Sequence, residues 1–191
     1  MNVLRKLKLS ARLAVLIAIF AIGFVLSGGW AFKTLDTLKV NGPIYERIVQ
    51  GKDLIADILP PPEYIIESYL LVLQLARAGD AGRQQALAER IRSLKGQFDE
   101  RHDFWQKQAL EPEMGRLLLD DAYRPAQEFY RLAFDELVPA ARVGDAGKVA
   151  STMQRLDAAY ETHRAAIDKV VELATKRVET DEGAARALLR E

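Results

Sequence analysis

Proline, histidine, and phenolic or charged side chains recur at similar heights along four successive helical segments of this sequence. An α-helix rises about 1.5 Å per residue, so counting residues from the two expected distal turns gives approximate heights. Pro61, Pro125 and His163 then lie about 27–28 Å from those turns, and His102 lies about 34 Å from them. We therefore expect polar or irregular elements from all four segments to meet in one zone.

Backbone chemistry favours a binding site in this zone. Pro60, Pro61 and Pro62 have no amide hydrogen, so carbonyl groups one turn earlier lose their partners within the helix. Pro125 frees the carbonyl of Asp121 in the same way. Carbonyl groups without a helical partner need water, a side chain or a ligand. The zone therefore offers acceptor groups that a ligand can use.

The side chains around the zone, Glu63 among them, predict a pocket for a small polar or anionic ligand of unknown identity. Arg124 or Arg164 would bind a ligand carboxylate through two parallel hydrogen bonds. The candidate ligand-binding residues are Pro60, Pro61, Pro62, Tyr64, Glu67, His102, Arg124, Tyr160, His163 and Arg164. The alternative is that the prolines only kink a helix and that the histidines are ordinary core residues.

A metal or haem site is a weaker interpretation of the same histidines. His102 with Asp99 or Asp103, and His163 with Glu161, have the ligand types of a divalent-cation site, and two histidines can also ligate non-covalent haem. The chain has no cysteine, which excludes disulfides, thiolate zinc and covalently attached haem. We expect no cofactor. Without a phosphate loop, a nucleophile elbow or an HExxH motif, we also do not expect an enzyme.

Helix formers dominate the composition, and no segment alternates with the period of a strand. The sequence predicts an all-α fold in which one N-terminal transmembrane helix precedes an antiparallel, up-down four-helix bundle. Its long helices are expected over about 33–77, 81–110, 113–142 and 146–188, with Asp145 capping the last of them. The clearest apolar stripe in the second helix is Leu87, Ile91, Leu94, Phe98, His102 and Trp105.

Residues 13–32 carry no charge and are numerous enough to cross a bilayer. Arg5, Lys6, Lys8 and Arg12 precede them, so residues 1–12 are expected in the cytoplasm and residues 33–191 in the periplasm of a bacterium. The predicted location is the inner membrane. The alternative is a signal peptide cleaved within 27–31, where small residues occur.

Charge and apolar patterning also bear on partners. The formal net charge is zero, so we expect no nucleic-acid partner. The segment from Tyr64 to Leu75 is apolar around most of its circumference and needs cover on more than one side. We therefore expect a homodimer with this helix near the two-fold axis. The alternative is that this helix is simply more central in the bundle than its neighbours.

Several segments resemble one subgroup of bacterial methyl-accepting chemotaxis proteins, or chemoreceptors. The basic N-terminus and single span resemble the start of such a receptor. The segment 39–71 (KVNGPIYERIVQGKDLIADILPPPEYIIESYLL) resembles its first sensor helix, and FDERHDFW (98–105) and YETHRAAIDKVVELA (160–174) resemble the second and fourth. The resemblance covers essentially the whole chain.

This resemblance implies a dimeric periplasmic sensor that relays ligand occupancy across the membrane. Full-length chemoreceptors continue into a second span, a HAMP linker and a cytoplasmic coiled coil. We expect the chain to be either a fragment of such a receptor or a stand-alone tethered bundle that binds a partner, metal or haem without signalling output. Chemotaxis and sensor-kinase outputs both stay open, because both can share such an input domain.

Overall fold

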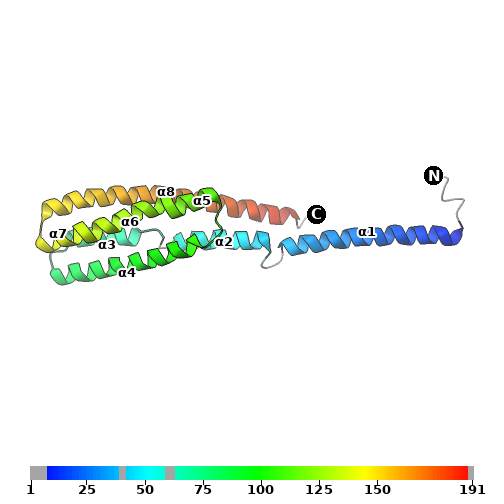
Figure 1. Ribbon diagram of the computed structural model, residues 1–191, viewed down its shortest axis with the longest axis horizontal. Coiled ribbons are helices and arrows are strands. Elements are labelled where there is room, and N and C mark those ends of the chain that lie inside the picture. Colours follow the sequence, from blue (N-terminus) through cyan, green and yellow to red (C-terminus); the bar gives the residue numbers. More distant parts are fainter. Residues whose placement is uncertain (1–7, 39–41, 59–62, 189–191) are drawn as a thin grey trace. The chain divides into compact units, whose positions relative to one another are not determined.

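The computed structural model describes residues 8–38, 42–58 and 63–188. All secondary structure in these ranges is helical, as the sequence predicts, and no strand occurs among them (Figure 1). The α-helices are α1 (Leu9–Leu38), α2 (Pro43–Ile58), α3 (Ile66–Arg77), α4 (Ala81–Gln106), α5 (Pro112–Arg116), α6 (Tyr123–Leu132), α7 (Val138–Val143) and α8 (Ala146–Leu188). The π-helical segments are η2 (Leu117–Ala122) and η3 (Ala133–Leu137).

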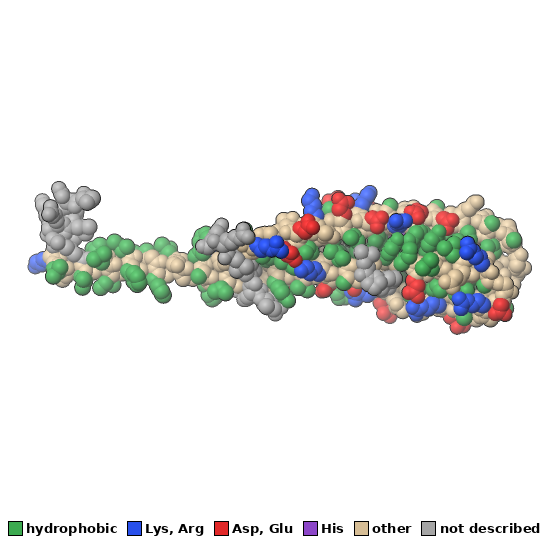
Figure 2. All heavy atoms as spheres, turned by 180° about the vertical axis from the view of Figure 1, so that it is seen from behind, with side chains coloured by type: hydrophobic (Ala, Val, Ile, Leu, Met, Phe, Trp, Pro, Cys, Tyr) green, Lys and Arg blue, Asp and Glu red, His purple; other side chains and the backbone are tan. Residues whose placement is uncertain are grey.

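Helix α1 is apolar and uncovered. Its stretch Leu9–Leu35, 27 residues long, is apolar and long enough to cross a membrane, and its most apolar window is 0% buried. Phe20 and Trp30 are 76% and 67% exposed. Figure 2 shows apolar side chains along this helix. The predicted span, 13–32, lies inside α1, whose helical residues extend beyond it at both ends.

The chain divides into two compact units, residues 1–49 with 181–191 and residues 50–180, which are described separately. In the first unit, α2 meets the end of α8 through Arg47 and Asp181. The guanidinium Nη2 lies 3.0 Å from one carboxylate oxygen of Asp181, and Nε donates to the other at 3.1 Å. The Asp181 side chain is only 9% exposed, so this two-point contact fixes the register between α2 and α8.

The second unit has two apolar clusters. One gathers α3, α4, α6, α7 and part of α8 around Phe98, Phe129 and Tyr130. The other gathers α2, the end of α4, η2 and the following part of α8 around Trp105 and Val170. The stripe predicted in the second helix, Leu87 to Trp105, is buried at every position, which confirms the assignment of its inner face.

Prolines explain the π-helical segments. In a regular helix the carbonyl groups of Asp121 and Asp135 would accept from the amides at positions 125 and 139, one turn later. Those positions hold Pro125 and Pro139, which have no amide hydrogen. Each of these aspartates lies in a π-helical segment, Asp121 in η2 and Asp135 in η3. A π-bulge adds one residue to the turn and relieves the mismatch that proline creates in a regular helix. The single helix predicted over 113–142 is therefore a series of α and π segments.

The other predicted helix bounds also need correction. The predicted helix 33–77 is divided among the end of α1, α2 and α3, with 39–41 and 59–62 outside the described residues. The helix predicted to reach residue 110 ends at Gln106, where Lys107 and Gln108 donate to carbonyls three residues back at 3.1 Å. Pro112 then starts α5 at a position where proline fits well.

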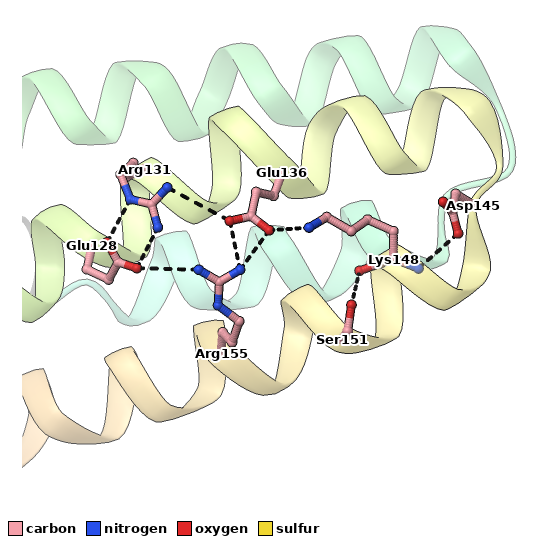
Figure 3. Close-up of polar contacts among 7 residues, drawn as sticks. All are labelled: Glu128, Arg131, Glu136, Asp145, Lys148, Ser151 and Arg155. Carbon is pink, nitrogen blue, oxygen red and sulfur yellow. Dashed lines mark hydrogen bonds and ion pairs between the residues drawn. The ribbon is translucent and has the colours of Figure 1, made fainter.

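The turn between α7 and α8 forms as the sequence predicts. Gly144 has a φ of 73°, which glycine adopts without strain, and the Asp145 carboxylate accepts from the amide of Lys148 at 2.9 Å. Figure 3 shows that the Lys148 side chain then reaches Glu136 on η3, with Nζ 2.5 Å from the carboxylate. Arg155 donates to the same carboxylate at 2.7 Å and thereby ties α8 to η3.

Gly51 lets α2 and α8 approach closely. A Cβ atom built on Gly51 would lie 2.5 Å from Cγ2 of Val178, far inside van der Waals contact. Val178 is β-branched and buried, so it has few alternative rotamers. The contact between the two helices therefore depends on the absence of a side chain at position 51.

We predict that Gly51→Ala lowers the free energy of unfolding by about 1–3 kcal/mol, because overpacking forces the two helices apart. Urea denaturation of the full chain in detergent micelles measures this change. The matched control is Gly96→Ala on the open face of α4, which should raise stability by about 1 kcal/mol. Adding Val178→Ala to Gly51→Ala should recover part of the loss. An equal gain from both glycine substitutions would contradict the close packing.

Candidate binding site in the second unit

The candidate site begins where α2 ends and α3 has not yet started. Pro60, Pro61 and Pro62 of the predicted zone lie outside the described residues. Glu63 and Tyr64 are described, and they lie in the second unit just before α3, which starts at Ile66. The N-cap of α3, Ile65, makes no side-chain capping bond, although its carbonyl accepts from the amide of Tyr69 at 2.9 Å. The residues just before α3 thus turn toward the interior of the second unit.

Glu63 is buried, and one of its two carboxyl oxygens has no hydrogen-bond partner. The residue is 2% exposed, and Oε1 makes no hydrogen bond. Burial raises the pKa of Glu63 from 4.5 to about 8, because the ionised form loses its hydration. At neutral pH the side chain is therefore mostly protonated and uncharged.

His163 lies on α8 at the same level and is fully buried. Its Nδ1 is 2.9 Å from the carbonyl oxygen of Ala122, the last residue of η2. A carbonyl can only accept, so Nδ1 carries the proton and Nε2 presents a lone pair. Nε2 has no hydrogen-bond partner. Burial lowers the pKa of His163 to about 4, although the backbone carbonyls of Ala122 and Glu63 act in the opposite direction.

Tyrosines form a layer beside these two groups. The hydroxyls of Tyr64 and Tyr160 are 2.6 Å apart, and the ring of Tyr160 stacks on Tyr69 with centroids 4.1 Å apart. Burial is the main cause that raises the pKa values of Tyr69 and Tyr160 above the usual range. The ring of Tyr64 also lies parallel to His163, with centroids 6.2 Å apart. The structure therefore brings Tyr64, Tyr160 and His163 together, as the height estimate predicts.

His102 belongs to a neighbouring part of the same level. Its ring stacks on Tyr123 with centroids 3.5 Å apart, and its Nε2 accepts from the Gln106 amide at 3.0 Å. Burial lowers the pKa of His102, against the effect of Asp103 and Asp99. Phe98 lies between the histidines, 5.8 Å from Tyr123 and 6.3 Å from His163 between ring centroids. Aromatic contacts thus link the two histidines.

The remaining predicted residues lie on the surface. The Arg124 side chain is 80% exposed and pairs with Asp120, its own helical neighbour. Arg164 is half exposed beside Glu161 and Asp168 on α8. Glu67 pairs with Arg90, the two charged groups 2.7 Å apart. The structure thus does not bring the two predicted carboxylate-binding arginines to the buried groups.

Sequence reasoning did not select Ser68 and Tyr130, which complete the polar layer. Their hydroxyl oxygens are 2.9 Å apart, and both residues are 1% exposed. Burial raises the pKa of Tyr130 above its usual range. Ser68, Val72 and Leu75 have the spacing of a buried helical face, and this spacing was the available signal that Ser68 points inward.

The metal interpretation gains no support in the described part of the chain. No group of three or more histidine, aspartate or glutamate side chains there is placed to hold a metal ion. His163 uses Nδ1 for the Ala122 carbonyl, and His102 uses Nε2 for Gln106. The site is better described as a layer of neutral acids, imidazoles and phenols.

Comparisons of the chain with protein families, curated proteins and solved structures give no match. What the site can do therefore follows from its own geometry. Its buried groups, Glu63, His163, the tyrosines and Ser68, can exchange hydrogen bonds and protons, and none of them carries a fixed positive charge.

We predict that Glu63→Gln raises stability progressively as the pH rises from about 4.5 to about 8. The folded protein keeps its proton on Glu63 over this range while the unfolded chain loses it, so wild-type stability falls relative to the variant by about 1.4 kcal/mol per pH unit. Above about pH 8 the difference should be constant. Urea denaturation of the full chain in detergent at several pH values measures it.

The control for this series is Glu89→Gln. Glu89 lies on the exposed face of α4, and its carboxylate accepts a hydrogen bond from Gln85, one turn earlier on the same helix. Its stability difference from the wild type should be small and independent of pH. A pH-independent difference for Glu63→Gln as well would show that the Glu63 carboxyl is hydrated and ionises normally.

Proposed function

We propose that this chain is the membrane-anchored sensor module of a bacterial transmembrane receptor of the chemoreceptor class. In this proposal α1 crosses the inner membrane, and the chain after it forms a four-helix bundle in the periplasm. The observation that carries the proposal is the apolar surface of α1: its 27-residue stretch Leu9–Leu35 is long and apolar enough to cross a membrane, and its most apolar window is 0% buried. A helix apolar all round requires burial, and a bilayer supplies it.

The polar layer supports a sensing role for the helical part. Glu63 and His163 have strongly shifted pKa values, and each has a buried polar atom without a hydrogen-bond partner. Shifted ionisable groups of this kind cluster at functional sites. We propose that this layer is where a ligand acts.

Contacts between α2 and α8 in the second unit suggest how a signal would reach the anchor. Arg177 on α8 donates to Gln50 on α2 at 3.0 Å, next to the close approach at Gly51. Helix α2 follows the anchor in the chain, and α8 carries His163. Packed helices respond to ligands by small shifts and rotations, so a ligand beside His163 would move α8 against α2.

We predict that residues on the two sides of the predicted span, 13–32, lie in different compartments. The chain has no cysteine, so single cysteines can report their position with a membrane-impermeant maleimide. Ser93→Cys on α4 should be labelled in intact spheroplasts, whereas Ser10→Cys should be labelled only after permeabilisation. Equal labelling of both, or a mature chain that begins near Phe32 and is freely soluble, would refute the anchored arrangement.

We also propose a homodimer through the outer face of α3. Its inner face is buried, but Leu70 is 51% exposed, with Ile66 and Leu73 partly exposed beside it at helical spacing. A second copy related by a two-fold axis would cover this stripe with the same stripe. The apolar character of α3 on both sides then has a physical reason.

We predict that Leu70→Glu weakens the dimer at least about tenfold, because each interface would then bury two carboxylates in place of two leucines. Sedimentation equilibrium of the full chain in density-matched detergent measures this change. The control is Val143→Glu, since Val143 is apolar and 79% exposed but lies at the α7–α8 turn. A monomeric wild type, or equal weakening by both substitutions, would contradict the interface.

A further inference from the structure

The buried polar layer contains acceptor groups without donors. Oε1 of Glu63 and Nε2 of His163 make no hydrogen bond, and both atoms are enclosed. Nε2 is an acceptor because Nδ1 holds the proton against the Ala122 carbonyl. The hydroxyls of Tyr64 and Tyr160 bond one another, and neither bonds these two acceptors. A buried acceptor without a donor is costly, and a ligand that supplies donors removes this cost.

Charge decides which donors fit. Three arginines at this height already have acidic partners: Arg124 and Arg164 pair with carboxylates on the surface, and Arg101 pairs with Asp57. An anionic ligand would therefore meet the Glu63 carboxyl without a compensating cation. A cationic ligand would instead meet a carboxylate that can ionise and balance its charge, beside the aromatic rings of Tyr64 and Tyr160.

We infer that the layer beside Glu63 and His163 binds a small protonated amine. Its N–H groups donate to the Glu63 carboxylate and to Nε2 of His163, and its alkyl part contacts the rings of Tyr64 and Tyr160. This ligand class narrows the small polar or anionic ligand expected from the sequence to a cation. The inference deepens the proposed function by naming what the sensor takes, and it can be tested without a membrane or a signalling output.

Release of a proton from Glu63 on binding distinguishes an amine bound at this site from an amine bound elsewhere on the protein. Free Glu63 is mostly protonated at pH 7, since its pKa is about 8. The bound ammonium requires the ionised carboxylate, so the Glu63 proton leaves to the buffer when the amine binds. Binding at pH 7 should release close to one proton, and release should nearly vanish at pH 9, where the carboxyl is already ionised.

The experiment is isothermal titration calorimetry of the full chain in detergent with propylamine, in two buffers of different ionisation enthalpy. Propionate and 1-propanol are the matched anionic and neutral probes. We expect propylamine to bind with proton release at pH 7, and we expect Glu63→Gln to weaken binding at least about tenfold and to abolish the release. Glu89→Gln is the control variant and should behave like the wild type.

Three outcomes would overturn the inference: no binding of propylamine or its homologues from methylamine to hexylamine, equal binding to the wild type and Glu63→Gln, or tighter binding of propionate. Each outcome is independent of whether α1 spans a membrane. Conversely, amine binding with proton release alongside a failed compartment assay would retain the site and reject the anchored sensor.

Discussion

The helical core keeps two ionisable side chains away from water, and its organisation follows from that constraint. Glu63 and His163 are both buried, and His163 contacts both apolar clusters, through Phe98 of one and Ala122 of the other. In this environment the uncharged form of each side chain is favoured, so Glu63 keeps its proton at neutral pH and His163 gains one only well below its usual pKa of 6.5. The polar layer therefore lies where the two apolar clusters meet, at the level where α2 gives way to α3.

Backbone irregularity supplies part of what this layer needs. Pro125 leads to the π-helical turn that ends at Ala122, and the carbonyl of Ala122 accepts the Nδ1 proton of His163. This bond fixes the tautomer and leaves Nε2 as the free acceptor. The carbonyl that Pro125 deprives of its helical donor is that of Asp121, one residue before Ala122. The His163 bond is therefore a second, separate contact at the same turn.

The sequence predicts the helices and the height of the polar layer, but it does not predict directions around each helix reliably. Height depends only on the number of residues from a turn, so Tyr64, Tyr160 and His163 are grouped correctly. The direction in which a side chain points from the helix axis changes by about 100° from one residue to the next. Three candidates on the surface directly adjoin inward-facing residues in the chain. They are Glu67 beside Ser68, Arg124 beside Tyr123, and Arg164 beside His163.

The most direct measurement is the titration of the Glu63 carboxyl itself. Carbon NMR of the full chain labelled at glutamate side-chain carboxyls, assigned with Glu63→Gln, follows this one group as the pH changes. A carboxyl enclosed by apolar and aromatic groups should titrate with a midpoint near pH 8. A midpoint near 4.5, the value of a hydrated glutamate, would mean that water reaches the layer and that the carboxyl is not enclosed as described.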